Sequence, residues 1–412
     1  MTNKRKIFND PVYGFVTIPS DLIFELVQHP YFQRLRRVKQ LGMSELVYPG
    51  AIHSRFQHAL GAMHLMNQAL DTLQLKGIMI MDIEREAAQI AILLHDIGHG
   101  PFSHALEYSI LDKVDHETIS SLLMEKLNKE FNGNLSLALD MFKGSYHRKF
   151  FNQLISSQLD MDRMDYLNRD SFFTGVAEGT VGVDRIIKML NVVDNELVVE
   201  EKGLLSVENF LVARRLMYWQ VYLHKTCISA ECMLINTIKR ARFLIKNNTK
   251  LEVPKHLLPF FEKSVGAGDF KNNPNILEAF VKLDDHDIWY MLKSWQYHPD
   301  KILSYLSESI LNRKLFKIKI GTNLDFAELK QEVFNDFTKA GIDSSDFEFL
   351  YSQNEISNSG YIPKSSNIKI LMKNGTIQEV SEASDLPTIK ALGNIVKKNY
   401  LCYAKDVYLQ FN

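Results

Sequence analysis

Residues 93–104, LLHDIGHGPFSH, place three histidines and one aspartate at the end of an apolar run. Divalent transition metals accept imidazole nitrogen and carboxylate oxygen, and a catalytic centre needs open positions beside its protein ligands. His95 and Asp96 are the candidate ligands of this stretch. A second such pair, His286-Asp287, has no histidines clustered around it and is interpreted as a polar pair at a helix start.

Two further segments carry residues suited to the same chemistry. HSRFQHALGAMH predicts a helix in which Arg55 and His58 share one face. LDMDRMDYLNRD repeats Asp162, Tyr166 and Asp170 every four residues, which places them on one face of a helix. A solvated charged helix remains an alternative explanation of the second pattern.

Helices must position these residues, because apolar side chains recur every three or four residues up to about residue 312. The spacing predicts helices over 54–75, 82–96, 116–128, 206–223 and 228–246. The predicted fold class is therefore mainly α. We expect a helical body over 1–312, with its metal core at about 50–230.

Other segments depart from helical spacing. A short β-hairpin is predicted at 191–205, around Lys202-Gly203. From about 313, β-type runs alternate with a helical segment, which predicts a small α+β appendage over 313–412. Asn374-Gly375 predicts a hairpin turn there. The serine-rich stretch 354–367 is predicted to be a flexible loop.

Composition restricts the partners. The 412 residues include 48 basic and 49 acidic side chains, so the net charge gives no general attraction to nucleic acid or to an anionic membrane. No apolar run approaches the roughly 18 residues of a membrane span. The three cysteines have no metal-binding or redox spacing. We expect a cytoplasmic chain without a membrane segment, and nucleic-acid binding is not indicated.

Together these motifs resemble the HD-domain metal phosphohydrolases, whose signature is H…HD…D. HDIGHGPFSH, SRFQH and DMDRMDYLNRD are similar to the deoxynucleoside triphosphate (dNTP) triphosphohydrolase branch, and the resemblance extends from Lys6 to about Lys225. It implies a helical HD body that holds one divalent transition metal (Fe, Mn, Zn, Ni or Co), with Mg as a possible companion of the nucleotide phosphates. The implied ligands are His58, His95, Asp96 and Asp162.

The resemblance also implies a reaction. A metal lowers the pKa of a bound water and polarises a phosphoryl oxygen, so water would attack the α-phosphorus and release a deoxynucleoside and tripolyphosphate. His99, His104 and His116 are the available proton donors, and Glu107 would orient His116. The sequence leaves open which histidine is the acid.

Substrate contacts are implied in the same way. Arg55 and Arg163 lie beside the metal ligands and could neutralise phosphate charge. Arg163 departs from the lysine expected at its position, which changes the geometry of the cation. The base preference is open, because Leu223 replaces a glutamine of better-known relatives and cannot read a base edge.

The sugar has its own predicted contacts. By resemblance, Gln40 and Asp170 would bind the 3′-hydroxyl, Leu41 and Tyr166 would wall the sugar, and Tyr222 would exclude a 2′-hydroxyl. Core packing remains the alternative for Leu41 and Tyr166. The remaining histidines, His53 among them, are interpreted as ordinary surface or core residues.

The run RLRRVK at 34–39 reads as a basic solvent face or a weak nucleic-acid patch from composition alone. The resemblance instead implies a regulatory nucleotide bound between subunits of a homo-oligomer, expected to be a tetramer. The implied contacts are Lys6, Ile7, Asn9, Gln33 and Arg36. Gln28 stands where guanine-activated members carry aspartate, so the effector is open.

Three function classes result. The leading one is a dNTP triphosphohydrolase. A second keeps the HD metal site but hydrolyses another phosphoester: a monophosphate, a ribonucleotide, a cyclic dinucleotide or a single-strand end. A third is a nucleotide sensor without catalysis.

Overall fold

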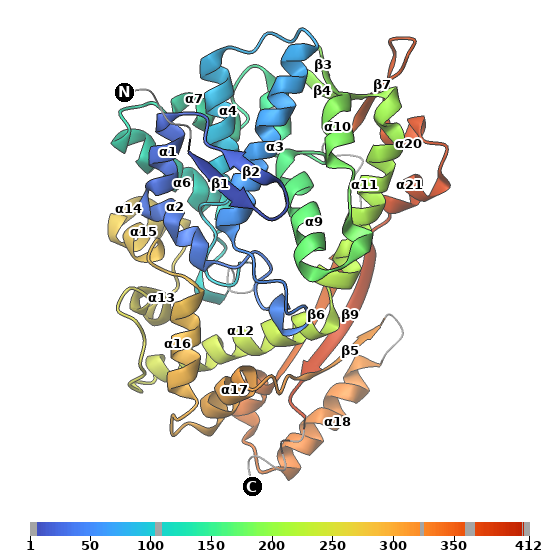
Figure 1. Cartoon of the computed structure of the whole chain (residues 1–412). Coiled ribbons are helices and arrows are strands. Elements are labelled where there is room, and N and C mark those ends of the chain that lie inside the picture. Colours follow the sequence, from blue (N-terminus) through green and yellow to red (C-terminus); the bar gives the residue numbers. More distant parts are fainter. Residues whose placement is uncertain (1–5, 104–108, 322–324, 359–366, 406, 408–412) are drawn as a thin grey trace.

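The computed structural model describes residues 6–103, 109–321, 325–358, 367–405 and 407. Helices form most of this part of the chain, and its strands form three small sheets of two, four and three strands (Figure 1). This confirms the mainly α fold class. None of the described helices is both long and apolar enough to cross a membrane.

The N-terminal segment packs on the helical core through a two-stranded hairpin and short helices. These are β1 (Ile7–Asp10), β2 (Gly14–Thr17), α1 (Asp21–Gln28), α2 (Pro30–Gln33) and the 3₁₀ turns η1 (Arg34–Arg37) and η2 (Ser44–Leu46). Two of the three arginines in the run RLRR, Arg36 and Arg37, are exposed, and the third is not. Arg34 is buried, and Arg37 donates to Asp284 at 2.5 Å.

Within the described residues, six helices build the part of the core that carries the predicted ligands. They are α3 (Arg55–Leu75), α4 (Asp82–Leu94), α6 (His116–Glu130), α7 (Ser136–Phe142), α8 (Lys149–Ile155) and α9 (Met161–Thr174). α3 starts in a capping box, in which the Ser54 N–H donates to Gln57 Oε1 at 2.9 Å. α3 packs against both α4 and α9, so the three ligand-bearing helices meet.

A close approach of α3 and α9 depends on one glycine. A Cβ atom on Gly61 would lie 2.0 Å from Asp165 Oδ1 and 2.2 Å from Arg169 Nη2. Both of these groups are buried on α9. The absence of a side chain at Gly61 therefore lets the polar face of α9 lie directly on α3.

A region of helices with one β-hairpin follows α9. Its elements are the 3₁₀ turn η3 (Ala177–Gly179), α10 (Val183–Met189), β3 (Leu190–Val193), β4 (Glu196–Glu200), the 3₁₀ turn η4 (Glu201–Gly203), α11 (Leu204–Met217), the π-helical turn η5 (Tyr218–Tyr222) and α12 (Lys225–Lys246). The predicted hairpin exists, but its turn was placed wrongly. Asp194 and Asn195 adopt positive φ values of 51° and 63° and form the turn. Lys202-Gly203 instead leads into α11.

Helix α12 crosses the lower part of the view in Figure 1, and several elements of the second half of the chain pack against it. Its helices are α13 (Leu258–Glu262), α14 (Ala267–Asn272), α15 (Pro274–Phe280), α16 (Asp285–Trp295), α17 (Lys301–Leu311), α18 (Phe326–Lys339), the 3₁₀ turn η6 (Ser344–Asp346), α19 (Phe347–Leu350), α20 (Val380–Ala383) and α21 (Pro387–Leu392). Its strands are β5 (Lys317–Gly321), β6 (Tyr351–Asn358), β7 (Lys369–Leu371), β8 (Ile377–Glu379) and β9 (Val396–Tyr403).

The C-terminal strands join two sheets. β5, β9 and β6 form one sheet in that order, while β7 pairs in parallel with β4 of the preceding region and antiparallel with β8. The predicted turn at Asn374-Gly375 is confirmed between β7 and β8, with a φ of 83° at Gly375. The loop predicted at 354–367 starts too early, because pairing with β9 extends β6 to Asn358.

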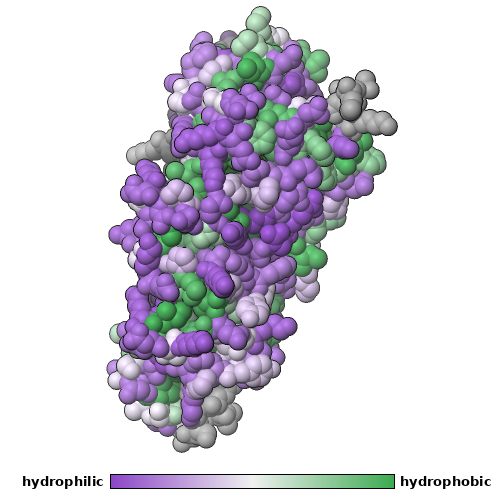
Figure 2. Space-filling view, turned by 90° about the vertical axis from the view of Figure 1, so that its left-hand side faces the viewer, coloured by the Kyte–Doolittle hydropathy of each residue, from purple (hydrophilic) through white to green (hydrophobic). Residues whose placement is uncertain are grey.

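The side of the molecule that carries α1, α14 and α15 is mainly hydrophilic, with separate apolar areas between the charged side chains (Figure 2). One continuous apolar core lies beneath, running from the N-terminal hairpin through α3, α4, α9 and α12 to the C-terminal sheet.

Candidate active site

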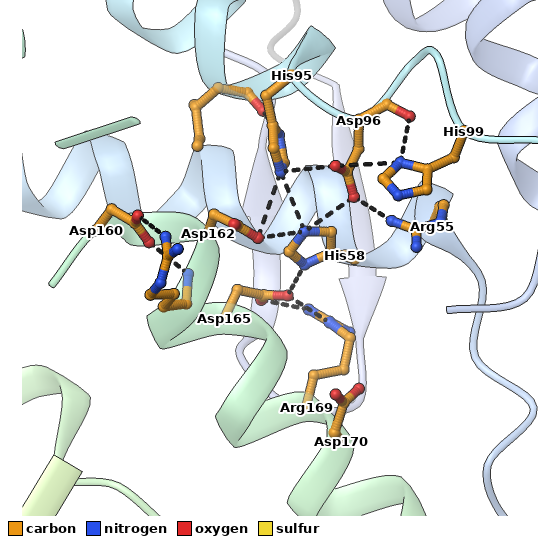
Figure 3. A network of polar contacts seen from close by, with 12 residues as sticks. Arg55, His58, His95, Asp96, His99, Asp160, Asp162, Asp165, Arg169 and Asp170 are labelled. Atoms are coloured by element: carbon orange, nitrogen blue, oxygen red, sulfur yellow. Dashed lines mark hydrogen bonds and ion pairs between the residues drawn. The ribbon is translucent and has the colours of Figure 1, made fainter. Parts of the chain in front are cut away.

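Three donor atoms from three helices meet at the centre of the site (Figure 3). His58 Nε2, on α3, lies 3.4 Å from His95 Nε2 at the end of α4 and 3.1 Å from Asp162 Oδ1 on α9. His95 Nε2 and Asp162 Oδ1 are also 3.4 Å apart. Donors held about 2.1 Å from one ion lie about 3.0–3.4 Å from each other, so this triangle fits a single divalent metal.

Neighbouring groups aim both imidazoles at the triangle. His58 Nδ1 bonds Asp165 Oδ2 at 2.7 Å, and His95 Nδ1 lies 2.6 Å from the carbonyl oxygen of Ile92. Arg169 holds Asp165 through two hydrogen bonds of 2.9 and 3.0 Å. Each Nδ1 atom thereby has a partner, and each Nε2 atom is free to bind a metal ion at the centre of the triangle.

Asp96 lies between this triangle and a second group of donors. Its Oδ2 is 3.6 Å from His58 Nε2, and its Oδ1 is 3.4 Å from His95 Nε2 and 3.3 Å from His99 Nδ1. Asp96, His99 and His116 form a second cluster whose ligand atoms are also close enough for one ion. The four expected ligands thus come together, but Asp96 faces both clusters.

The electrostatics favour a cation in the triangle. Burial opposes a charged His58, yet hydrogen bonds to Asp162 and Asp165 outweigh it and raise the pKa of His58 to about 10. Burial would raise the pKa of Asp162, but the two imidazoles hold that pKa well below its usual range. The carboxylates that stabilise an imidazolium here equally stabilise a bound metal ion.

The candidate proton donors lie on the other side of Asp96. The rings of His99 and His116 stack with centroids 3.8 Å apart. Burial, and then the charge of Arg55, hold the pKa of His99 well below its usual value. His104 and Glu107, the other predicted members of this group, lie outside the described residues.

The two predicted phosphate-binding arginines are held by carboxylates. Arg55 pairs with Asp96 through Nη1 and donates from Nε to Ser103 Oγ at 2.9 Å. Arg163 pairs with Asp160, the N-cap of α9. Arg55 thus contacts the expected ligand Asp96 directly, whereas Arg163 pairs with Asp160 and follows the ligand Asp162 along α9.

The predicted sugar contacts form a connected chain of hydrogen bonds. The Tyr222 hydroxyl donates to Asp170 Oδ2 at 2.8 Å, and Asp170 Oδ1 is 2.7 Å from His53 Nε2. The backbone N–H of Gln40 donates to the backbone carbonyl oxygen of His53 at 3.0 Å. Tyr166 meets Tyr222 edge to face with ring centroids 6.1 Å apart.

His53 is one residue of this site that the sequence interpretation missed, and Asp165 and Arg169 beside His58 are two others. His53 is buried, and its ring stacks on Phe173 with centroids 4.5 Å apart. Its signal was its position five residues before His58, in the extended segment just before α3. That segment returns beside Gln40, which no local spacing could predict.

Leu41 and Gln40, which are both predicted to contact the sugar, have different surroundings. Leu41 is half-buried and packs against the apolar core. Gln40 Oε1 is buried and has no hydrogen-bond partner within the part of the chain that the structure describes. A buried amide oxygen without a donor is costly, so this atom is suited to a ligand hydroxyl.

Comparison with known proteins agrees with this geometry. Residues 55–170 match the model of the HD domain, and residues 181–253 match the HD associated region. A solved phosphohydrolase from Bacteroides thetaiotaomicron is 51% identical, with a TM-score of 0.94 over 98% of this chain and 100% of that chain. The uncharacterized protein YwfO of Bacillus subtilis is 34% identical over 98% of this chain and 93% of its own length.

The chain belongs to the HD-domain family related to the dNTP triphosphohydrolases. Human deoxynucleoside triphosphate triphosphohydrolase SAMHD1 is 29% identical over 57% of this chain and 44% of that protein. The predicted family is thus confirmed. The HD domain match begins at Arg55 and ends at Asp170, so it contains the whole metal triangle.

The residues predicted to bind a regulatory nucleotide lie at the N-terminal edge of the HD domain. Ile7, on β1, is 58% exposed, and Asn9 is exposed on the same strand. Arg36 donates to Gln33 Oε1 at 2.9 Å and lies 3.6 Å from the centroid of the Phe56 ring. Lys6 lies 5.5 Å above the ring of Phe24.

Proposed function

We propose that this HD-domain phosphohydrolase hydrolyses dNTPs to a deoxynucleoside and tripolyphosphate. One observation carries the proposal: a single helix, α9, bears both Asp162 of the metal triangle and Asp170 of the Tyr222 hydrogen-bond chain. These two residues are eight positions apart on one face, or about 12 Å along the helix axis. An α-phosphate at one end and the 3′-hydroxyl of its sugar at the other fit this span.

The metal centre would use His58, His95, Asp96 and Asp162. When bound, a divalent ion supplies Lewis acidity toward the phosphoryl oxygen and the attacking water. The mixed imidazole and carboxylate donors suit Fe, Mn, Co, Ni or Zn, and Mg would accompany the phosphates. The remaining chemistry belongs to side chains of this chain.

In the reaction, the oxygen of water forms a bond to the α-phosphorus, and the bond from phosphorus to the 5′ oxygen breaks. The deoxynucleoside leaves with a proton on its 5′ oxygen. Of the two described histidines beside Asp96, His116 is the better candidate to give that proton, because the low pKa of His99 disfavours its protonated form. Arg55 and Arg163 balance the charge on the phosphate chain.

Selectivity for deoxyribose would come from the chain of hydrogen bonds that joins Tyr222, Asp170 and His53. The 3′-hydroxyl has one hydrogen and would donate it to Gln40 Oε1 or to Asp170, and of the two only Gln40 Oε1 lacks a partner among the described residues. Tyr222, fixed by its bond to Asp170, would occupy the space that a 2′-hydroxyl requires. Human SAMHD1 and its Dictyostelium discoideum homolog, 30% identical over 61% of this chain, are both named as dNTP triphosphohydrolases.

We propose regulation by a second nucleotide in a cytoplasmic homotetramer. The exposed side chain of Ile7 beside Asn9, with Arg36 nearby on η1, supports a contact surface at β1. Sedimentation with and without added nucleotides tests this assembly. A monomer under all conditions would contradict it.

Chromatography of the products tests the main proposal. Purified chain is incubated with each dNTP and each ribonucleotide, singly and in pairs, with Mg or Mn. Deoxynucleoside plus tripolyphosphate supports attack at the α-phosphorus, and faster turnover with a second nucleotide supports regulation. Release of orthophosphate or pyrophosphate instead would contradict the proposed site of attack.

The second cluster of donors favours one alternative. Asp96, His99 and His116 would be able to hold a further ion, and two ions commonly clamp a phosphodiester. Metal analysis of the purified chain separates the two functions. One ion per chain favours the triphosphohydrolase, and two favour hydrolysis of another phosphoester.

A further inference from the structure

Helix α16 brings one buried carboxylate to both loops that border the site. Asp285 is 1% exposed. Its Oδ2 accepts from the N–H of Lys39 at 2.9 Å, and its Oδ1 accepts from the N–H of Phe102 at 2.7 Å. Lys39 directly precedes Gln40, and Phe102 lies three residues after His99. Asp285 thus connects the segment before Gln40 with the loop that carries His99.

A second set of bonds connects the same two segments to a metal-triangle neighbour. Ser103 Oγ donates to the carbonyl oxygen of Lys39 at 3.0 Å and accepts from Arg55 Nε at 2.9 Å. Arg55 in turn pairs with Asp96. Both backbone groups of Lys39 are therefore held, one by Asp285 and one by Ser103.

The loop that Asp285 holds has an unfavourable backbone. Phe102 and Ser103 have φ values of 53° and 52°, a left-handed conformation that non-glycine residues seldom adopt. Such a conformation persists only where surrounding contacts determine it. The Phe102 ring also meets Trp289, one turn further along α16, with centroids 5.7 Å apart.

Arg34 anchors the start of the same loop. Its guanidinium donates to the carbonyl oxygens of Ile97 at 2.7 Å, His99 at 2.8 Å and Leu283 at 3.1 Å. Leu283 lies two residues before Asp285. Arg34 therefore connects the start of the 97–103 loop to Leu283, just before α16. Asp285, at the start of α16, holds the end of the same loop.

Capping of α16 does not account for Asp285. The N-cap is Asp284, which accepts from the N–H of His286 at 3.0 Å. Asp287 completes the capping box by accepting from the N–H of Asp284 at 3.0 Å. Burial raises the pKa of Asp285 to about 6, against its two backbone hydrogen bonds, so an ionised carboxylate here is costly.

We propose that Asp285 is a positioning residue of this enzyme, which sets Gln40 and His99 relative to each other by holding the backbone of both loops. The inference rests on the proposed function for its substrate. Its structural part, the bridge between Lys39 and Phe102, stands independently. Asp285 belongs to DDHDIWY, a stretch for which the sequence predicted only a polar pair at the start of a helix.

The test compares Asp285→Asn with Asp287→Asn, a matched change two residues further along the same helix. An asparagine offers one acceptor oxygen and cannot satisfy both N–H groups. We expect Asp285→Asn to retain its metal, to lower kcat at least about 10-fold and to raise KM, since a displacement of about 1 Å has effects of this size. Amide hydrogen exchange at Lys39 and Phe102 should accelerate. Asp287→Asn should leave kcat, KM and both amides unchanged.

The assay takes whichever nucleotide the unmodified chain hydrolyses, so loss of the dNTP proposal leaves this comparison intact. Unchanged kcat and KM in Asp285→Asn would overturn the positioning role, as would a lower melting temperature alone. If the variant does not fold, the unmodified chain decides. Its Lys39 and Phe102 amides must exchange at least about 100-fold slower than free amides, and rapid exchange at either would overturn the bridge.

Discussion

The Tyr222 hydroxyl donates to Asp170 Oδ2 at 2.8 Å, which fixes a tyrosine ring beside the second half of α9. The other carboxylate oxygen of Asp170 is 2.7 Å from His53 Nε2. Burial, and then the charge of Asp170, hold the pKa of Tyr222 well above its usual value, so the phenol stays protonated and remains a donor. Tyr222 and His53 thus engage the two carboxylate oxygens of Asp170, and the bond to Asp170 positions the Tyr222 ring.

Removing the ring should relax sugar selectivity. In Tyr222→Ala, we expect the ratio of kcat/KM for a dNTP over its ribonucleotide to fall at least about 10-fold, because the 2′-hydroxyl gains space. Tyr222→Phe keeps the ring and loses only the hydrogen bond, so it should retain most of the selectivity. Equal selectivity in Tyr222→Ala and the unmodified chain would contradict the steric role.

The metal ligands and the proton donors should separate by mutation. Asp162→Ala should lose both bound metal and turnover, since it removes one corner of the triangle. His116→Ala should retain metal in the triangle and lose turnover at least about 100-fold. Elemental analysis beside a turnover assay measures both quantities. Substantial activity in either variant would refute the assigned site.

The partner of His58 should tune metal affinity. Asp165→Asn weakens the 2.7 Å contact to His58 Nδ1, and the affinity for metal should fall about 10–100-fold. Excess metal should restore much of the turnover. Asp71→Asn, an exposed change on α3, provides the control. If both variants bind metal equally well, Asp165 does not orient the ligand.

The close approach at Gly61 predicts a large cost in stability. Gly61→Ala places a methyl group 2.0 Å from Asp165 Oδ1, so the free energy of unfolding should fall by about 1–3 kcal/mol. Gly268→Ala is the matched change on α14, where no atom lies within 4 Å of the new Cβ. Urea denaturation compares the two, and a neutral Gly61→Ala would contradict the packing of α3 on α9.

Stability at acid pH should depend on Glu84. Burial raises the pKa of Glu84, but hydrogen bonds from Tyr146 at 2.6 Å and Arg148 at 2.7 and 2.8 Å lower it overall below its usual 4.5. The unfolded chain then binds the proton more readily, so this contribution to stability is complete at pH values well above the usual pKa of 4.5 and is lost as the pH falls below that value.

Urea unfolding at pH 7 and at about pH 4 measures this loss. Glu84→Gln should be less stable than the unmodified chain at pH 7 and should lose less stability on acidification. Glu86→Gln, on the same helix, should behave like the unmodified chain. An identical pH response in Glu84→Gln would assign the acid sensitivity to other groups.

The family resemblance predicted the metal triangle better than local spacing predicted its surroundings. Apolar periodicity predicted the helices of His58 and His95, a four-residue repeat indicated a helix face for Asp162, and the family signature related the three segments. Asp285 contacts Phe102 across 183 residues, and no periodicity encodes such a contact. His53 pairs with Asp170 from an extended segment whose path depends on the finished fold.

The secondary structure shows the same limit. The hairpin turn was assigned to Lys202-Gly203 because glycine is the strongest turn signal, whereas Asp194 and Asn195 adopt the required left-handed backbone. The polar stretch at 354–358 has the composition of a loop. It becomes a strand because β9 supplies its hydrogen-bond partners.

The parallel pairing of β7 with β4 affects the order of assembly during synthesis. β4 can pair with β3 as soon as both emerge from the ribosome, but its other edge keeps unpaired N–H and C=O groups until Lys369 has been translated. A nascent chain therefore carries an open strand edge from Glu200 to Lys369, which is about two fifths of its 412 residues. Chaperones that shield such edges have their longest opportunity to bind at this strand.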